Sequence, residues 1–231
     1  MKSLLDHLAR YRSSWPIIGV ILAISALMVS SVIFLHLWKE IPTDHLTRDL
    51  NSIMEVPFYI GFLSQIGLFL WSATVAVCMF SARILSRRAT RHPLTSFLLS
   101  SGLLTMLLGL DDAFQLHEEV LPAIGIPEIV VYASYLLLLL LYLIKYQSII
   151  RQTEHILLIM ALLFFGVSVI LDILEYPPRA QYVFEDGAKL VAIISWMAYF
   201  LRTGASAVYA PARQQTVIRD SYLASLPGKR A

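Results

Sequence analysis

The feature that most constrains this chain is a series of six apolar runs, each long enough to cross a lipid bilayer. A helix needs about 20 mostly apolar residues to span the hydrocarbon core. The runs are Pro16–Trp38, Val56–Phe80, Leu94–Phe114, Ile129–Ile144, Ile156–Tyr176 and Phe184–Leu201. None of them alternates as a barrel strand does, and the bilayer core offers no water to backbone groups. The predicted fold class is therefore all-α, a polytopic membrane protein with a bundle of six transmembrane helices.

The composition agrees with lipid as the main solvent of this chain. Of its 231 residues 58% are hydrophobic and only 15% are charged, with a mean hydropathy of +0.70. Soluble domains keep about 25% charged residues to cover their surface. The single cysteine, Cys78, lies within an apolar run, so no intrachain disulfide can form. The expected partners are the bilayer and other membrane proteins, not nucleic acid.

The charged residues are divided unequally between the two sides that the six spans define. Fourteen of the eighteen Lys and Arg residues fall on one side: Lys2, Arg10, Arg12, Arg83, Arg87, Arg88, Arg91, Lys145, Arg151, Arg202, Arg213, Arg219, Lys229 and Arg230. Cytoplasmic loops carry such an excess of basic residues. We therefore expect both termini in the cytoplasm of a bacterial cell, the spans in its inner membrane, and the opposite face in the periplasm.

Three regions are expected along the chain. Residues 1–15 form a cytoplasmic N-terminal segment, whose first twelve residues can lie flat on the membrane surface. Residues 16–202 form the transmembrane domain, and residues 203–231 a basic tail that stays near anionic lipid. The first apolar run is followed by no small-x-small cleavage site, so it is predicted to be a retained anchor rather than a signal peptide.

The outward face is acidic. Thirteen of the sixteen acids are expected there: Glu40, Asp44, Asp49, Glu55, Asp111, Asp112, Glu118, Glu119, Glu128, Asp172, Glu175, Glu185 and Asp186. Asp111, Asp112, Asp172 and Lys189 lie about one turn inside the apolar boundaries, where an unpaired charge costs roughly 2–3 kcal/mol or more. Such residues face the bundle interior, pair with one another, or line a wet cavity.

Helical geometry predicts which of these groups share a face. At about 100° per residue, Asp111, Gln115 and Glu118 lie on one face of the third span, and His117 points about 120° away from Asp111. The polar stripes of the last two spans are Ser168, Asp172, Glu175 and Tyr176 on the fifth, and Glu185, Lys189, Ala192, Trp196 and Tyr199 on the sixth. Since three helices present polar faces at one depth, we expect them to converge.

Converging carboxylates favour a bound cation. Because like charges repel, such groups either stay protonated or hold a cation. Oxygen ligands suit Ca²⁺, Mg²⁺ or Mn²⁺, and histidine shifts the preference toward Mn, Fe or Zn. The candidate metal ligands are Asp111, Asp112, His117, Glu118, Asp172, Glu175 and Glu185, with Lys189 as internal counter-charge. The predicted function is an outward-facing cation site, with a divalent cation (Ca, Mn, Fe or Zn) as cofactor and the carboxylates as ligands or proton carriers.

No sequence motif specifies a reaction. The Glu-x-x-His pair of helical di-iron sites is absent, since Phe114 precedes His117 by three residues. His-Glu-x-x-His and Gly-x-Ser-x-Gly are absent as well. A zinc hydrolase needs about three histidines, and only His36, His45 and His117 are expected outside, with His45 in a loop. Whether the chain is an enzyme stays open.

Two alternative functions remain. In a structural or accessory subunit, Lys189 pairs with Glu185, Asp186 or Asp172 and only holds the last two spans together. In a small proton-coupled transporter, a polar path through Ser64, Gln65 and Gln115 extends inward from the acidic site.

Three segments of the chain resemble parts of uncharacterised bacterial integral-membrane proteins. They are residues 110–118 (LDDAFQLHE), 125–128 (GIPE) and 185–189 (EDGAK). The resemblance covers roughly the third to the sixth span. It implies no activity, but it draws attention to the same polar positions.

The predicted topology can be tested with a reporter enzyme that is active only outside the cytoplasm. Fused after Ala231, the reporter should give no signal, because all four basic segments place the C-terminus inside. Fusion of the same reporter in the loop after Trp38 should give full signal. Activity at the C-terminal position would contradict the orientation.

Overall fold

The computed structural model describes residues 15–57, 59–88, 93–174 and 178–209. In these ranges all regular secondary structure is helical, and six helices are long and apolar enough to cross a membrane. The all-α class and the six predicted spans are thereby confirmed. The predicted interfacial segment before Trp15 and the tail after Tyr209 lie outside the described residues. The orientation of the termini stays a prediction.

The helix bounds differ from the predicted spans mainly where polar residues extend a helix. The long helices are α2 (Trp15–Lys39), α5 (Phe62–Arg88), α6 (Pro93–Phe114), α8 (Glu128–Arg151), α9 (His155–Ile173) and α10 (Pro178–Tyr209). The short ones are α3 (Thr43–Thr47), α4 (Leu50–Ile53), the π-helix η1 (Leu116–Val120) and α7 (Leu121–Ala123). Helix α5 begins later than predicted because Glu55 and Gly61 adopt positive φ angles, 51° and 71°. Helix α10 continues seven residues into the predicted tail.

The chain divides into two compact units, residues 1–60 and 61–231. In the first unit α2 is apolar on every side and has no buried residue. A helix that is apolar all round is typical of a lipid-embedded segment. The predicted outward groups of this unit include His36, whose Nδ1 donates a 2.8 Å hydrogen bond to the Ile41 carbonyl.

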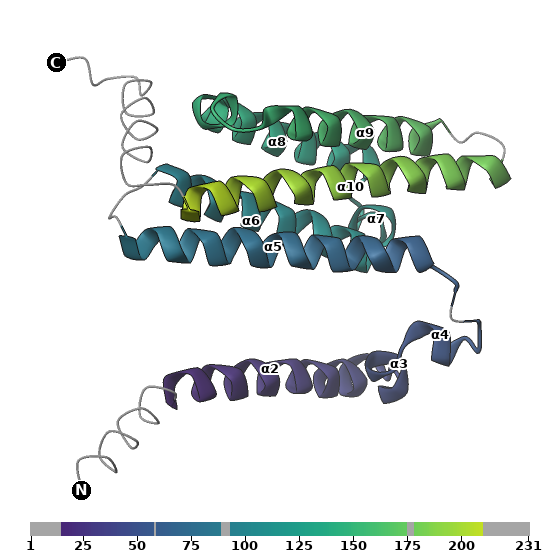
Figure 1. Ribbon diagram of the computed structural model, residues 1–231. Helices are drawn as coiled ribbons and strands as arrows, with labels where there is room; N and C mark the ends of the chain where they lie inside the picture. The colour runs from purple at the N-terminus through teal and green to yellow at the C-terminus, as the bar shows by residue number, and fades with distance from the viewer. Residues whose placement is uncertain (1–14, 58, 89–92, 175–177, 210–231) are drawn as a thin grey trace, which may run out of the picture. The chain divides into compact units, whose positions relative to one another are not determined.

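In the second unit α10 packs between α5 and α9, and α6 packs on α5, as Figure 1 shows. Successive helices run in opposite directions. The start of α5, the end of α6, the start of α8, the end of α9 and the start of α10 therefore lie at one end of this unit. We call it the Asp111 end, after the buried acid in the last turn of α6.

The interior of this second unit is built largely from aromatic side chains. The ring of Phe97 lies 5.3 Å from that of Tyr146 and 6.0 Å from that of Phe200, between centroids. The Trp196 ring lies 5.0 Å from the Phe200 ring. All four side chains are at most 1% exposed. Since the helices are apolar on most sides, bulky rings that interlock decide which face turns inward.

Helix α8 is attached through a row of tyrosines. The phenol groups of Tyr142 and Tyr146 lie 2.6 Å and 2.8 Å from the hydroxyls of Ser101 and Ser100 on α6. Tyr132 and Tyr135, near the start of the same helix, also bond to neighbouring helices. Their spacing of three, seven and four residues places all four on one helix face. Long side chains that end in a hydroxyl thus join α8 to its neighbours.

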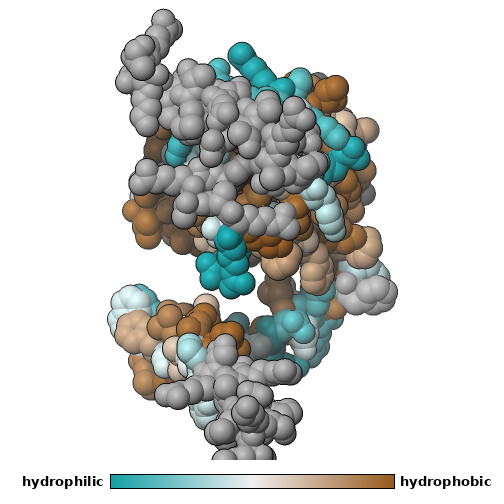
Figure 2. All heavy atoms as spheres, turned by 60° about the vertical axis from the view of Figure 1, so that its left-hand side comes forward, coloured by the Kyte–Doolittle hydropathy of each residue, from teal (hydrophilic) through white to brown (hydrophobic). Residues whose placement is uncertain are grey.

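The outer flanks of these helices are apolar. Leu99 and Leu103 on α6, and Leu136, Leu137 and Leu140 on α8, are exposed. Figure 2 shows hydrophobic side chains over much of the visible surface. Such an extent of exposed apolar surface would be unfavourable in water and is expected where lipid covers it.

Candidate functional site

The site begins where the last turn of α6 breaks. Gln115 adopts a left-handed conformation with φ 49° and ψ 46°, which is uncommon outside glycine. The five residues that follow, Leu116–Val120, form the π-helix η1. Such short π-segments occur often at functional sites. The regular 100° rotation on which the sequence prediction relied therefore ends at Phe114.

The break brings His117 onto Asp111. The His117 backbone N–H donates a 3.0 Å hydrogen bond to Asp111 Oδ1, and His117 Nδ1 lies 2.6 Å from Asp111 Oδ2. Both residues are buried. The prediction that His117 points about 120° away from Asp111 is wrong, because the left-handed residue and the π-turn redirect the chain.

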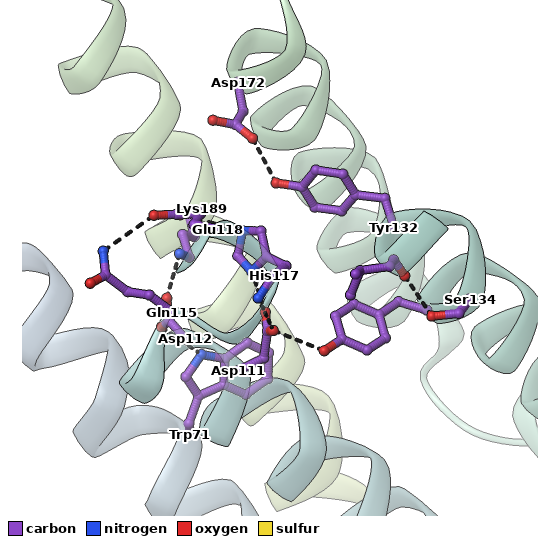
Figure 3. A network of polar contacts seen from close by, with 12 residues as sticks. Trp71, Asp111, Asp112, Gln115, His117, Glu118, Tyr132, Ser134, Asp172 and Lys189 are labelled. Carbon is purple, nitrogen blue, oxygen red and sulfur yellow. Dashed lines mark hydrogen bonds and ion pairs between the residues drawn. The ribbon is translucent and has the colours of Figure 1, made fainter. Parts of the chain in front are cut away.

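A second carboxylate lies on the other side of the imidazole. His117 Nε2 is 3.3 Å from Glu118 Oε1, and Gln115 Nε2 donates a 3.2 Å hydrogen bond to Glu118 Oε2. Tyr135 donates a 2.8 Å hydrogen bond to Asp111 Oδ1. Figure 3 shows the imidazole between the two acids, and Tyr132, whose ring centroid is 5.0 Å from that of His117, lies beside it.

The surroundings raise the pKa of His117 above its usual value. Burial by itself lowers this pKa because it disfavours the charged imidazolium, and the Lys189 ammonium acts in the same direction. The hydrogen bond to Asp111 and the negative charges of Asp111 and Glu118 outweigh both effects. The site therefore favours a protonated histidine between two carboxylates.

The neighbouring acid, Asp112, forms a separate ion pair. Its Oδ1 pairs with Lys189 Nζ on α10, and Trp71 Nε1 on α5 donates a 3.1 Å hydrogen bond to its Oδ2. Lys189 thus places a positive charge beside Asp112 inside the second unit. Its ion-pair partner among the described residues is an acid of α6, however, and not an acid of α9 or α10. The prediction that Lys189 pairs with Glu185, Asp186 or Asp172 considered only acids of its own helix and of the preceding span, so it did not include Asp112.

The remaining predicted residues are less tightly joined. Tyr132 donates a 2.6 Å hydrogen bond to Asp172 Oδ2, which links α8 to α9. Glu185 and Asp186 on α10 form no ion pair or hydrogen bond with the described side chains. Glu175 lies outside the described residues. Three acids that were expected to form one cluster, Asp111, Asp112 and Asp172, instead have separate partners.

No group of three or more His, Cys, Asp or Glu side chains in the described ranges is arranged to hold a metal ion. The buried acids already accept hydrogen bonds from protein donors, so fewer of their lone pairs remain for a metal. The divalent cation and its ligand set stay predictions.

Sequence reasoning missed three residues that complete the site: Trp71, Tyr132 and Tyr135. Their donors satisfy the acids that were expected to need a cation. The regular spacing of tyrosines on α8 was the available signal, but it could not show which acids they meet.

The polar path of the transporter alternative is not seen in the described part. Gln65 and Gln115 are both exposed at the helix surface. Below Asp112, the rings of Trp71 and Phe165 stack with centroids 5.6 Å apart, and Phe165 meets Trp196 edge-on at 6.2 Å. This aromatic layer lies directly beneath the polar groups.

Residues 17–203 match a protein family described as a domain of unknown function (DUF8692). No curated protein and no solved structure matches the chain.

The Asp112–Lys189 pair predicts a large effect of Lys189→Met on stability. Loss of one partner leaves a charge in an apolar interior, which costs 3–5 kcal/mol for fully buried pairs. Because the Lys189 side chain is 35% exposed, we expect about 2–3 kcal/mol, measured as a fall in the free energy of unfolding in detergent.

Glu185→Gln, on the same helix, is the control and should change stability little. The double variant Asp112→Asn with Lys189→Met should recover part of the loss, since it removes both charges. Equal stability of Lys189→Met and the wild type would show that the ion pair contributes nothing.

Proposed function

The chain belongs to the DUF8692 family, and we propose that it is an integral membrane protein whose Asp111–His117–Glu118 site takes up and releases a proton on one side of the membrane. The observation that carries the proposal is the position of the imidazole: Nδ1 lies 2.6 Å from a buried carboxylate, and Nε2 lies 3.3 Å from a second one.

The two carboxylates have different roles in this proposal. Asp111 is buried and also accepts from a backbone N–H and a tyrosine, so it holds the ring in place. The Glu118 side chain is 45% exposed, and it can pass a proton between Nε2 and water. Histidine changes charge near physiological pH, which makes His117 the proton carrier. The proton is then the cation of the acidic site.

The aromatic layer formed by Trp71, Phe165 and Trp196 supports proton exchange with water at the Asp111 end only. An indole N–H donates a hydrogen bond but cannot accept a proton. Trp71 donates to Asp112, and Trp196 donates a 2.9 Å hydrogen bond to Thr105 Oγ1. A proton that reached Asp112 would therefore find no acceptor in Trp71. This opposes the transporter alternative and favours a site that responds to pH.

The charge asymmetry of the loops supports an outward orientation of the site. Basic residues gather in the loops at the opposite ends of the spans, which are expected in the cytoplasm. The Asp111 end would then face the periplasm of a bacterial inner membrane, and both termini would be cytoplasmic.

A second candidate function is that of a structural or accessory subunit. It is favoured by the Asp112–Lys189 pair and by the Tyr132–Asp172 bond, which join helices directly. In that case His117 would only stabilise the turn after α6. Direct titration of His117 separates the two functions.

We expect NMR spectra of histidine-labelled protein in detergent to show that His117 titrates with a pKa above the usual value of 6.5. Asp111→Asn should lower this pKa, because it removes the negative charge and the acceptor. A His117 signal that does not change between about pH 5 and about pH 9 would refute a proton carrier.

The raised pKa of His117 also predicts how stability depends on pH. The folded state binds the proton more tightly than the unfolded state, so the stabilisation is complete below the unfolded pKa near 6.5. It is lost as the pH rises through the higher folded pKa. The melting temperature of the wild type should therefore fall above about pH 6.5. The melting temperature of His117→Gln should fall less steeply with rising pH. If it fell as steeply as that of the wild type, groups other than His117 would cause the effect.

A further inference from the structure

A small pocket opens beside Lys189, between α5 and α10. Its volume is about 40 Å³ and its lining residues are Leu63, Ser64, Gly67, Asp112, Asp186, Lys189, Leu190 and Ile193. A space of this size holds more than one water molecule. Gly67 forms part of its wall, where a Cβ atom would lie 3.3 Å from Ile193 Cδ1 and 3.8 Å from Asp112 Oδ2.

The charges on the pocket wall favour a cation. Lys189 and Asp112 neutralise each other in their ion pair, which Figure 3 shows above the Trp71 ring. Asp186 contributes a second carboxylate, which feels the charge of Lys189 but has no hydrogen bond or close ion pair with the described side chains. The Ser64 hydroxyl has no hydrogen-bond partner there either. The described residues that line the pocket thus carry two carboxylates and one ammonium, and Asp186 and Ser64 can accept hydrogen bonds there.

The geometry indicates which cation. A primary ammonium brings three N–H donors and can satisfy a carboxylate and a hydroxyl at once. A quaternary ammonium has no N–H, and proteins hold it in cages of aromatic rings. The pocket lining contains no aromatic residue. A metal ion would need more oxygen ligands than these groups provide.

The depth of the pocket indicates what carries the ammonium. Lys189 lies five residues after Phe184, where the last apolar run begins, about 7–8 Å along the helix axis. Ser64 lies at the start of α5. This is the level at which lipid headgroups meet the hydrocarbon core. Leu63, Leu190 and Ile193 provide apolar contacts for the alkyl part of an amphiphile.

We propose that the pocket binds the primary ammonium group of an amphiphile, with the ethanolamine headgroup of a phospholipid as its source. Asp186 accepts from the ammonium, Ser64 accepts at its side, and the lipid phosphate stays toward the membrane surface. The pocket is a binding site in addition to the proton site at His117 and shares no residue with it.

The test compares lipids bound to the purified full-length protein. Protein reconstituted in vesicles of equal parts phosphatidylethanolamine and phosphatidylcholine is extracted in mild detergent, and the retained lipid is counted by native mass spectrometry. One hydrogen bond to a charged group is worth about tenfold in affinity. We expect about tenfold more phosphatidylethanolamine than phosphatidylcholine on the wild type, and near-equal amounts on Asp186→Asn. Equal retention of both lipids by the wild type would overturn the proposal.

Matched variants test the pocket rather than the overall charge. Glu185→Gln removes a neighbouring acid that does not line the pocket and should retain the preference. Gly67→Ala keeps every charge but narrows the pocket with an added methyl group. It should therefore weaken the preference for phosphatidylethanolamine. If Glu185→Gln lost the preference as fully as Asp186→Asn, a diffuse negative field would explain the result and the pocket would be refuted.

Two further experiments distinguish a lipid headgroup from a free amine and test whether the pocket needs the proton site. Soluble ethanolamine that raises the melting temperature of delipidated wild type, but not of Asp186→Asn, would confirm the ammonium and assign it to a free amine. His117→Gln should retain the lipid preference. The lipid result therefore stands or fails independently of the titration of His117.

Discussion

The Asp111 carboxylate is the group on which the polar end of the second unit depends. Its two oxygens accept from the His117 backbone, the His117 ring and the Tyr135 phenol. These donors belong to η1 and α8, and Asp111 itself belongs to α6. In an apolar interior a charged group is stable only when its hydrogen-bonding capacity is filled. The left-handed turn at Gln115 follows from this need, because a regular helix would carry His117 away.

Two consecutive acids serve two sides of the same helix. Neighbouring residues in a helix point about 100° apart. Asp111 therefore faces α8 and η1, while Asp112 faces Trp71 on α5 and Lys189 on α10. The tyrosines of α8 bond to Asp111, to Asp172 and to serines of α6, and these bonds together fix how α8 docks. The two consecutive acids therefore connect α6 to α8 on one side and to α5 and α10 on the other.

The sequence predicted the class of fold and the six apolar helices, but not how the polar residues pair with one another. Apolar length identified all six spans, because lipid permits few other solutions. The rarity of charge in such spans drew attention to Asp111, Asp112, Asp172 and Lys189, which all have polar partners in the structure. The partner of Lys189 depends on which helices are neighbours in the bundle. Hydropathy identifies the spans but does not tell which of them pack against each other. The contact of His117 with Asp111 depended on one positive φ angle at Gln115, a residue that rarely adopts it.

The proton site and the pocket share a charge balance. Protonated His117 and the Lys189 ammonium repel each other, which is why Lys189 lowers the tendency of His117 to bind a proton. An ammonium beside Asp186 would add a further positive charge on the same end of the helices. The coupling between the two sites is reciprocal. If a bound ammonium weakens proton binding at His117 by some free energy, a bound proton weakens ammonium binding in the pocket by the same amount. The Asp111 end has room for both ligands, because they occupy different residues, but their like charges make each one weaken the binding of the other.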